Sequence, residues 1–248
     1  MPFVTILVGV ASGILLGAVS LGLLGGLIQS PALTRGAHVA ARGAAAILVI
    51  GALLGWGSGL PTLESVTGMV DRRALEGPVL SLMLMAALAI PLRVDGPGKA
   101  PWSSSLLYVP AWLLSSTALF HVASPARAAA AADWVTPLRF SLAVCGGVGA
   151  RAAGQSLQAI AAGNPGVEWP GRLAYGMLTL VWGVFGLVNL WQRGGLWVVA
   201  DPVLRGGMTG AWLAWTADWV MPRRHWRIGA ALTMLAALLL VLAAVRTV

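Results

Sequence analysis

Residues 194–219 read GGLWVVADPVLRGGMTGAWLAWTADW and join two apolar runs of the chain. A glycine pair, Trp197 and the pair Asp201–Pro202 occupy the short connection, and three more tryptophans follow in the second run. Glycine and proline are typical of turns, and a turn between two long apolar runs is typical of a helical hairpin in a membrane. The stretch therefore predicts two membrane-spanning helices with a tryptophan-bearing loop between them.

Tryptophan is concentrated around this loop. Of the 12 tryptophans in the chain, half lie between Trp182 and Trp219. Tryptophan belts are common wherever a membrane protein meets the headgroup layer, and this is one interpretation of the cluster. The other is a flat aromatic surface that holds a planar cofactor at the edge of the membrane. Residue type alone leaves both interpretations open.

The composition is that of a membrane protein. The 248 residues are 58% hydrophobic and only 10% charged, and the mean hydropathy is +0.84. A soluble domain is about a quarter charged. The 16 basic residues are scattered at the ends of apolar segments rather than gathered in a patch, which argues against a nucleic-acid partner. Cys145 is the single cysteine, so no intramolecular disulfide is possible.

We expect an all-α, polytopic transmembrane bundle of about eight spans that forms one domain over residues 1–248. About 20 apolar residues are needed for each span. The predicted spans are about Phe3–Ile28, His38–Leu54, Gly77–Leu92, Ser105–His121, Leu138–Ala162, Leu173–Trp191, Val203–Val220 and Ile228–Ala244. In the first of them Gly9, Gly13 and Gly17 recur once per turn and predict a face for close helix contact.

Eight spans place both termini and the Trp197 loop on one side of the membrane. The tightest basic cluster, Arg223, Arg224 and Arg227, falls on the opposite side. Basic residues favour the cytoplasmic side, so we expect the Trp197 loop on the periplasmic or outer face of a bacterial-type inner membrane. The expected partners are the lipid bilayer and other membrane protein subunits.

Few residues of this chain are candidates for chemistry. Of the three histidines, only His121 is predicted on the same side of the membrane as the Trp197 loop. Its role is either that of a metal ligand or that of an ordinary interfacial histidine. Arg151, Gln155 and Gln158 fall on one face of the fifth span. This stripe could bind a propionate, a lipid phosphate or a partner carboxylate, or it could bridge helices through Asn189 or Thr179.

No catalytic apparatus is visible in the sequence. There is no Ser/His/Asp set, no HExxH, no phosphate-binding loop and no pair of carboxylates at a useful spacing. The sequence therefore assigns no enzyme activity. Broken helices in matching halves, which would favour a small transporter, are not evident either.

Four stretches carry a resemblance to a known family. The chain resembles the cytochrome c assembly family of haem-handling membrane proteins, whose signature is a tryptophan-rich loop on the outer face that ends in Asp–Pro in several branches. The loop 194–203 is similar to that signature, and the spans on either side of the loop are similar to the corresponding spans of the family. The similar stretches are Gly194–Val203, Trp212–Leu213, Leu178–Gly183 with Gly186, and Trp226–Ala230.

The resemblance implies that the chain binds or presents haem at the outer face. It implies Trp197 as a platform for the porphyrin, Asp201 as a residue that shapes the loop, and His121 as the axial ligand of the iron. It also implies that Arg139 or Arg151 meets a propionate.

The chain departs from the family pattern in two places. One tryptophan stands in the loop where the family has several, and Arg139 stands where the family usually has a histidine near the start of the fifth span. These departures motivate a second hypothesis. The chain would then be a non-catalytic structural subunit of a larger electron-transfer or photosynthetic complex that has lost its haem ligands.

Overall fold

The computed structural model describes residues 3–57, 78–91, 101–123, 137–164, 169–195 and 202–245, and within these ranges the chain is helical without strands. The prediction of an all-α fold is confirmed. The α-helices are α1 (Phe3–Leu27), α2 (Pro31–Gly57), α3 (Pro78–Ala89), α4 (Val109–Ala123), α5 (Pro137–Ala162), α6 (Trp169–Arg193), α7 (Pro202–Val220) and α8 (Trp226–Val245). Two short 3-10 helices, η2 (Pro101–Leu107) and η4 (Arg223–His225), precede α4 and α8.

Four helices of the described chain have the length and the apolar composition needed to cross a membrane. They comprise Thr5–Leu27, Pro31–Leu54, Pro170–Gln192 and Arg223–Val245, and Val79–Ala89 is a shorter apolar helix. Large apolar side chains are also exposed on the outside of the bundle, for example Leu27, Val39 and Leu180. This is the pattern of an integral membrane protein, in which lipid covers such side chains.

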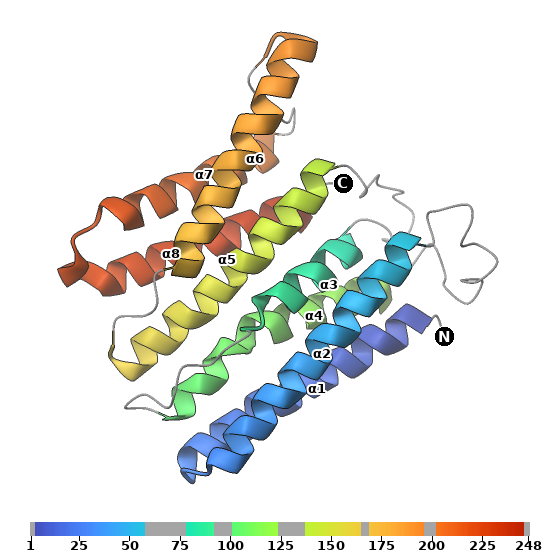
Figure 1. Cartoon of the computed structure of the whole chain (residues 1–248), viewed down its shortest axis with the longest axis vertical. Helices are drawn as coiled ribbons and strands as arrows, with labels where there is room; N and C mark the ends of the chain where they lie inside the picture. Colours follow the sequence, from blue (N-terminus) through green and yellow to red (C-terminus); the bar gives the residue numbers. More distant parts are fainter. Residues whose placement is uncertain are drawn as a thin grey trace.

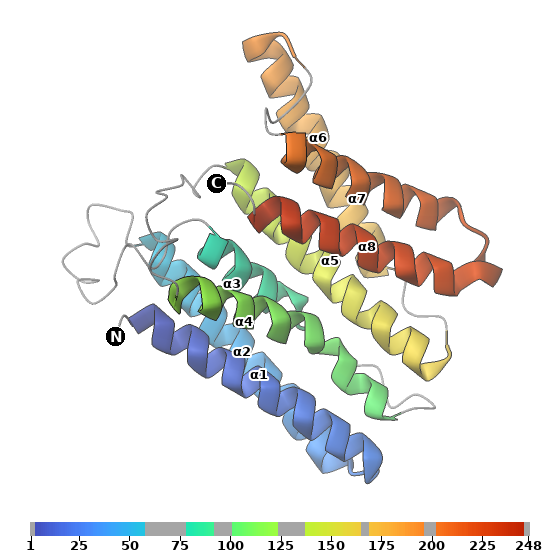
Figure 2. The same ribbon diagram turned by 180° about the vertical axis from the view of Figure 1, so that it is seen from behind.

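The helices form a slab with α5 near its middle (Figure 1). On one side of α5 lie α3 and α4, followed by the hairpin α1–α2, and on the other side lie α6, α8 and α7. The first turn of α1 and the last turn of α8 lie at the same end of the slab (Figure 2). The C-terminal end of α4 and the start of α7 also lie there, whereas the α7–α8 turn lies at the opposite end.

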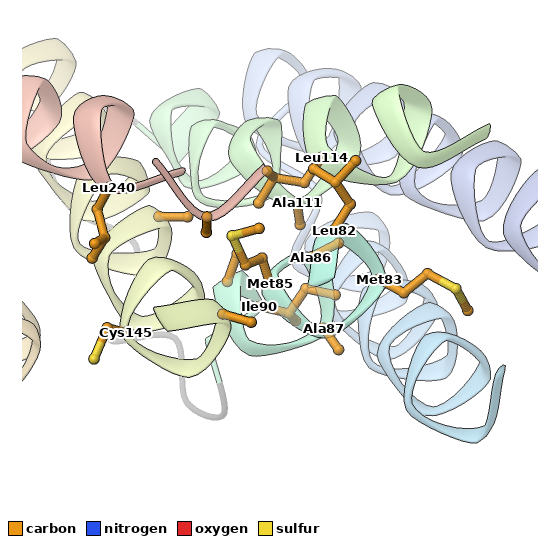
Figure 3. Packing of buried hydrophobic residues seen from close by; sticks show 14 of the residues in the cluster. Leu82, Met83, Met85, Ala86, Ala87, Ile90, Ala111, Leu114, Cys145 and Leu240 are labelled. Atoms are coloured by element: carbon orange, nitrogen blue, oxygen red, sulfur yellow. The ribbon is translucent and has the colours of Figure 1, made fainter. Parts of the chain in front are cut away.

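The shortest helix, α3, lies at the centre of the core. Figure 3 shows Leu82 and Met85 of α3, and Ile90 directly after it, between Leu114 of α4 and Cys145 of α5, and all five are buried. Apolar residues surround α3 on every side, as expected for a helix that packs against others all round. Its 12 residues rise only about 18 Å, less than the roughly 30 Å of a bilayer core.

The glycine face predicted on α1 is correct at only one position. A Cβ on Gly9 would lie 3.8 Å from Leu119, but Gly13 and Gly17 face open space. A close contact between helices instead involves Gly147 of α5, where a Cβ would lie 3.1 Å from Cα of Met85 and 3.2 Å from its carbonyl oxygen. Gly147 thus lets α5 touch the backbone of α3.

Candidate functional site

The connection that carries the family resemblance lies between α6 and α7. Trp197 and Asp201 themselves fall outside the described residues. Asn189 closes the end of α6 by donating its side-chain amide to the carbonyl of Gly195 at 2.8 Å. Gly194 has a φ of 71°, a left-handed conformation that glycine adopts without strain and that commonly ends a helix. Pro202 then begins α7, where a proline costs no hydrogen bond.

His121 lies in the last turn of α4, half-buried, with its ring edge-on to Phe120 at a centroid distance of 6.4 Å. This end of α4 and the start of α7 are at the same end of the slab (Figure 2). They are on different sides of it, because α4 packs on α1, α3 and α5 while α7 packs mainly on α8. Among the described residues no three potential metal ligands of the His, Cys, Asp or Glu type come together.

The two candidate arginines lie on α5 but at different depths. Arg139 is in the first turn, at the end of the slab where α7 begins, and its side chain lies outside the described part of the structure. Arg151 follows 12 residues later, which at about 1.5 Å per residue is roughly 18 Å further along the helix. Arg151 is half-buried, like Gln155 and Gln158 of the same stripe.

Several of the clustered aromatic residues form a seam between α6 and α7. Trp182 stacks on Trp212 with 6.0 Å between ring centroids, and Trp212 stacks on Tyr175 at 5.9 Å. Tyr175 in turn meets the ring of Trp219 edge-on at 5.5 Å. The indole of Trp212 donates to the hydroxyl of Thr179 at 3.1 Å. These rings contact one another, so within the described chain they act as the contact between two helices.

The described helices enclose a pocket of about 170 Å³ at the opposite end of the slab, between α5, α6, α7 and α8. Its lining combines small residues, which leave the space, with polar and aromatic ones. The polar and aromatic residues of the lining include Gln155, Arg172, Tyr175, Trp215, Asp218, Trp219, Arg223, His225 and Thr233.

Two of the residues that line the pocket carry a buried polar atom without a hydrogen-bond partner. Trp215 is only 2% exposed, and its indole nitrogen is buried without a hydrogen-bond partner. The side-chain oxygen of Gln155 is also buried without a partner. Leaving such groups unpaired costs about 1–3 kcal/mol each. Both atoms are covered by the surrounding helices rather than open to the cavity.

At the mouth of the pocket, Arg172 contacts an aromatic ring and Asp218 contacts a hydroxyl group. The guanidinium of Arg172 lies over the ring of Trp219, 5.6 Å from its centroid. Asp218 accepts a hydrogen bond from the hydroxyl of Thr233 at 3.2 Å. The carboxylate also packs against Gly229, where even a Cβ would collide with it. Glycine at this position thus lets the end of α7 lie directly on α8.

This pocket was not predicted from the sequence. From the sequence, Gln155 was assigned only to a polar stripe on the fifth span. Neither Arg172 nor Trp215 was recognised as a site residue from the sequence. For Trp215 the reason is that a tryptophan inside an apolar run is typical of a helix core. Recognising the site requires knowing that α5 and α8 adjoin, which hydropathy does not reveal.

Comparisons with models of protein families, with curated proteins and with solved structures find no match to this chain. A function must therefore be argued from the residues and their arrangement.

Proposed function

We propose that this chain is an eight-span membrane protein that binds or presents haem at the end of the slab where α6 joins α7. The observation that carries the proposal is the pattern from Gly194 to Ala230, whose Asp–Pro pair leads into a helix. The stretch 194–202 links the end of α6 to the start of α7 at the same end of the slab as His121, although on the other side of α5. This end faces the outside if the Arg223–Arg227 end is cytoplasmic.

The residues have distinct parts in this proposal. Trp197 packs against the porphyrin, and Asp201 with Pro202 fixes the loop that presents it. His121 offers a ring nitrogen to the iron, which when bound supplies the redox-active centre. Of the two arginines, the position of α5 favours Arg139 for a propionate, because Arg151 lies roughly 18 Å deeper along the helix. A half-buried histidine at a helix end is a suitable ligand donor.

The test is a reduced-minus-oxidised absorption spectrum of the protein purified in mild detergent, with and without added haem. We expect a Soret band that is lost in Trp197→Ala and in His121→Ala. His225→Ala is the matched control, because His225 lies in the turn before α8 at the other end of the slab. A haem-loaded sample without a Soret band, or an equal loss in His225→Ala, contradicts the proposal.

One observation favours the second candidate, a structural subunit of a larger electron-transfer or photosynthetic complex. The C-terminal half of α6 projects beyond the other helices (Figure 1, Figure 2). Its apolar side chains are exposed, with Leu180 at 68%, Leu187 at 65% and Trp191 at 90%. A helix of a partner subunit could pack along this face.

A native gel of solubilised membranes separates the two candidates. A structural subunit migrates only in a large complex and carries no haem. Leu187→Trp would enlarge the face of α6 and is expected to release the chain from that complex, whereas Leu27→Trp, at a similarly exposed position at the end of α1, leaves it bound. Migration of the wild-type chain as a stable monomer contradicts this candidate.

A further inference from the structure

We propose that a second copy of this chain packs its α2 lengthwise against α6 of the first copy, with glycines of one helix opposite large apolar side chains of the other. The proposal does not rest on haem binding. It identifies the neighbour that covers the exposed face of α6 as another copy of the chain.

One face of α2 is exposed along most of the helix. Ala37, Ala41, Ala44 and Leu48 are buried against the bundle, and the residues on the opposite side of the helix are exposed. These exposed residues follow one another at alternating intervals of four and three residues, the spacing of a helix face that packs along another helix. They are Ala32, Gly36, Val39, Gly43, Ala46, Ile50 and Leu53.

The outer face of α6 has the same spacing. It lies on the side of the helix opposite the buried Ala174, Leu178 and Val181, and its residues are exposed or half-exposed. They are Leu173, Gly176, Leu180, Gly183, Leu187 and Leu190. In the first two-thirds of this face, leucine and glycine therefore alternate.

The glycines on these two faces are not explained by contacts within the described chain. A Cβ at Gly36, Gly43, Gly176 or Gly183 would meet nothing within 4 Å, and alanine stabilises a helix more than glycine does. Small residues are enriched where helices meet in a membrane, because they let two helices approach closely. The four glycines therefore indicate close approach of a helix from outside the chain.

The two faces complement each other when α2 and α6 lie parallel. Both helices begin at the same end of the slab, so copies that insert in the same orientation present them in parallel. Gly36 is the sixth residue of α2 and Leu173 is the fifth residue of α6, so these two residues lie at a similar depth. Aligning them places a glycine opposite a larger residue four times in succession. The facing pairs are Gly36 with Leu173, Val39 with Gly176, Gly43 with Leu180, and Ala46 with Gly183.

Charge favours α6 over a second α2 as the neighbour. Arg35 and Arg42 are exposed beside the α2 face, so two α2 helices in contact would bring like charges to one interface, which is unfavourable. The α6 face has no charged residue between Leu173 and Leu190. Because α2 and α6 lie on opposite sides of α5 (Figure 1), each copy can bind one neighbour through α2 and another through α6. Such contacts build a ring or a row of copies.

The experiment is disulfide cross-linking of full-length chains in the membrane, in a Cys145→Ala background that removes the single native cysteine. Val39→Cys and Gly176→Cys are made in two separately tagged copies of the chain, which are produced together. A disulfide needs a Cα–Cα separation of about 4.4–6.8 Å, which facing residues of closely packed helices reach. We expect a cross-linked product that carries both tags after mild oxidation, and none when either variant is produced alone.

A shifted pair is the matched control. Val39→Cys is combined with Gly183→Cys, which lies seven residues beyond Gly176 and therefore roughly 10 Å further along α6. This pair should not cross-link. Equal cross-linking of the shifted pair would indicate random collision, and cross-linking of Val39→Cys alone would indicate contact between two α2 helices. Either result overturns the proposal. The absence of a product from the facing pair, as expected if lipid or a different subunit covers α6, overturns it as well.

Filling one of the glycine positions tests the packing. Gly43→Leu should lower the cross-linked fraction of the facing pair by at least about fivefold, because the added side chain collides with Leu180 of the neighbouring copy. Gly13→Leu makes the same change at an exposed glycine of α1 with open space around it, and it should leave the fraction unchanged. A thermal midpoint of Gly43→Leu near that of the parent shows that the chain is still folded. An unchanged cross-linked fraction in Gly43→Leu overturns the proposal. Haem spectra play no part in these readouts, so this inference and the proposed function fail separately.

Discussion

Gly147→Ala is expected to destabilise the bundle by about 1–3 kcal/mol, the usual cost of an extra methyl group in a packed core. The added Cβ would lie 2.6 Å from Cβ of Leu88 and 3.1 Å from Cα of Met85. Because the backbone of α3 is among the colliding atoms, a change of side-chain rotamer cannot relieve the contact. In a chain of this size the melting temperature falls by about 2–4 °C for each kcal/mol.

Gly183→Ala is the matched control for this substitution. Gly183 is also inside a helix, but a Cβ there meets nothing within 4 Å. The variant should gain up to about 1 kcal/mol from the higher helix propensity of alanine. The two variants are compared by the loss of helical circular dichroism on heating in one detergent. Equal melting temperatures would contradict the close approach of α5 to α3.

Leu240→Ala is expected to cost about 2–5 kcal/mol, since it removes a buried side chain and leaves a cavity. Leu240 is 0% exposed and lies in the core beside Cys145 and α3 (Figure 3). Lipid tails are as apolar as leucine, so tight packing between helices rather than exclusion from water stabilises a bundle of this kind. The packing contacts of the Leu240 side chain are therefore lost without replacement in Leu240→Ala.

Leu238→Ala is the matched control on the same helix. It distinguishes the loss of core packing from a general loss of hydrophobic surface. Leu238 is 55% exposed, so its replacement changes mainly a surface that faces detergent or lipid. The free energy of unfolding should change by less than about 0.5 kcal/mol. Urea or heat titrations of both variants measure the difference. A similar cost at both positions would mean that α8 does not face the core as described.

Hydropathy predicted the helices well because each apolar run has to be long enough for a membrane and is bounded by polar turns. The predicted fifth span, Leu138–Ala162, nearly coincides with α5. The second helix begins at Pro31 rather than at His38, since proline occupies the first position of a helix without losing a hydrogen bond. Whether all eight helices cross the membrane stays a prediction.

Sequence patterns predicted less of the packing and of the sites. Periodic glycines suggested contact at Gly13, yet a close backbone approach is found at Gly147, whose partner Met85 of α3 lies 62 residues earlier in the chain. The spacing of glycines along one helix does not identify the neighbouring helix that those glycines contact. The pocket was missed for the same reason, because four helices contribute to it. The predicted haem residues Trp197 and Asp201 lie outside the described part of the chain, so their roles stay predictions.

The short α3 has a consequence for the order in which the protein is assembled in the membrane. At about 18 Å it is a poor match for a bilayer of roughly 30 Å, and an isolated helix of this length would deform the lipid around it. Its neighbours include α5, which is synthesised about 50 residues later. A translating ribosome therefore releases α3 before half of its partners exist. We expect the helix to reach its final depth only when α5 inserts beside it, which would make packing at the centre of the bundle a late step of biogenesis.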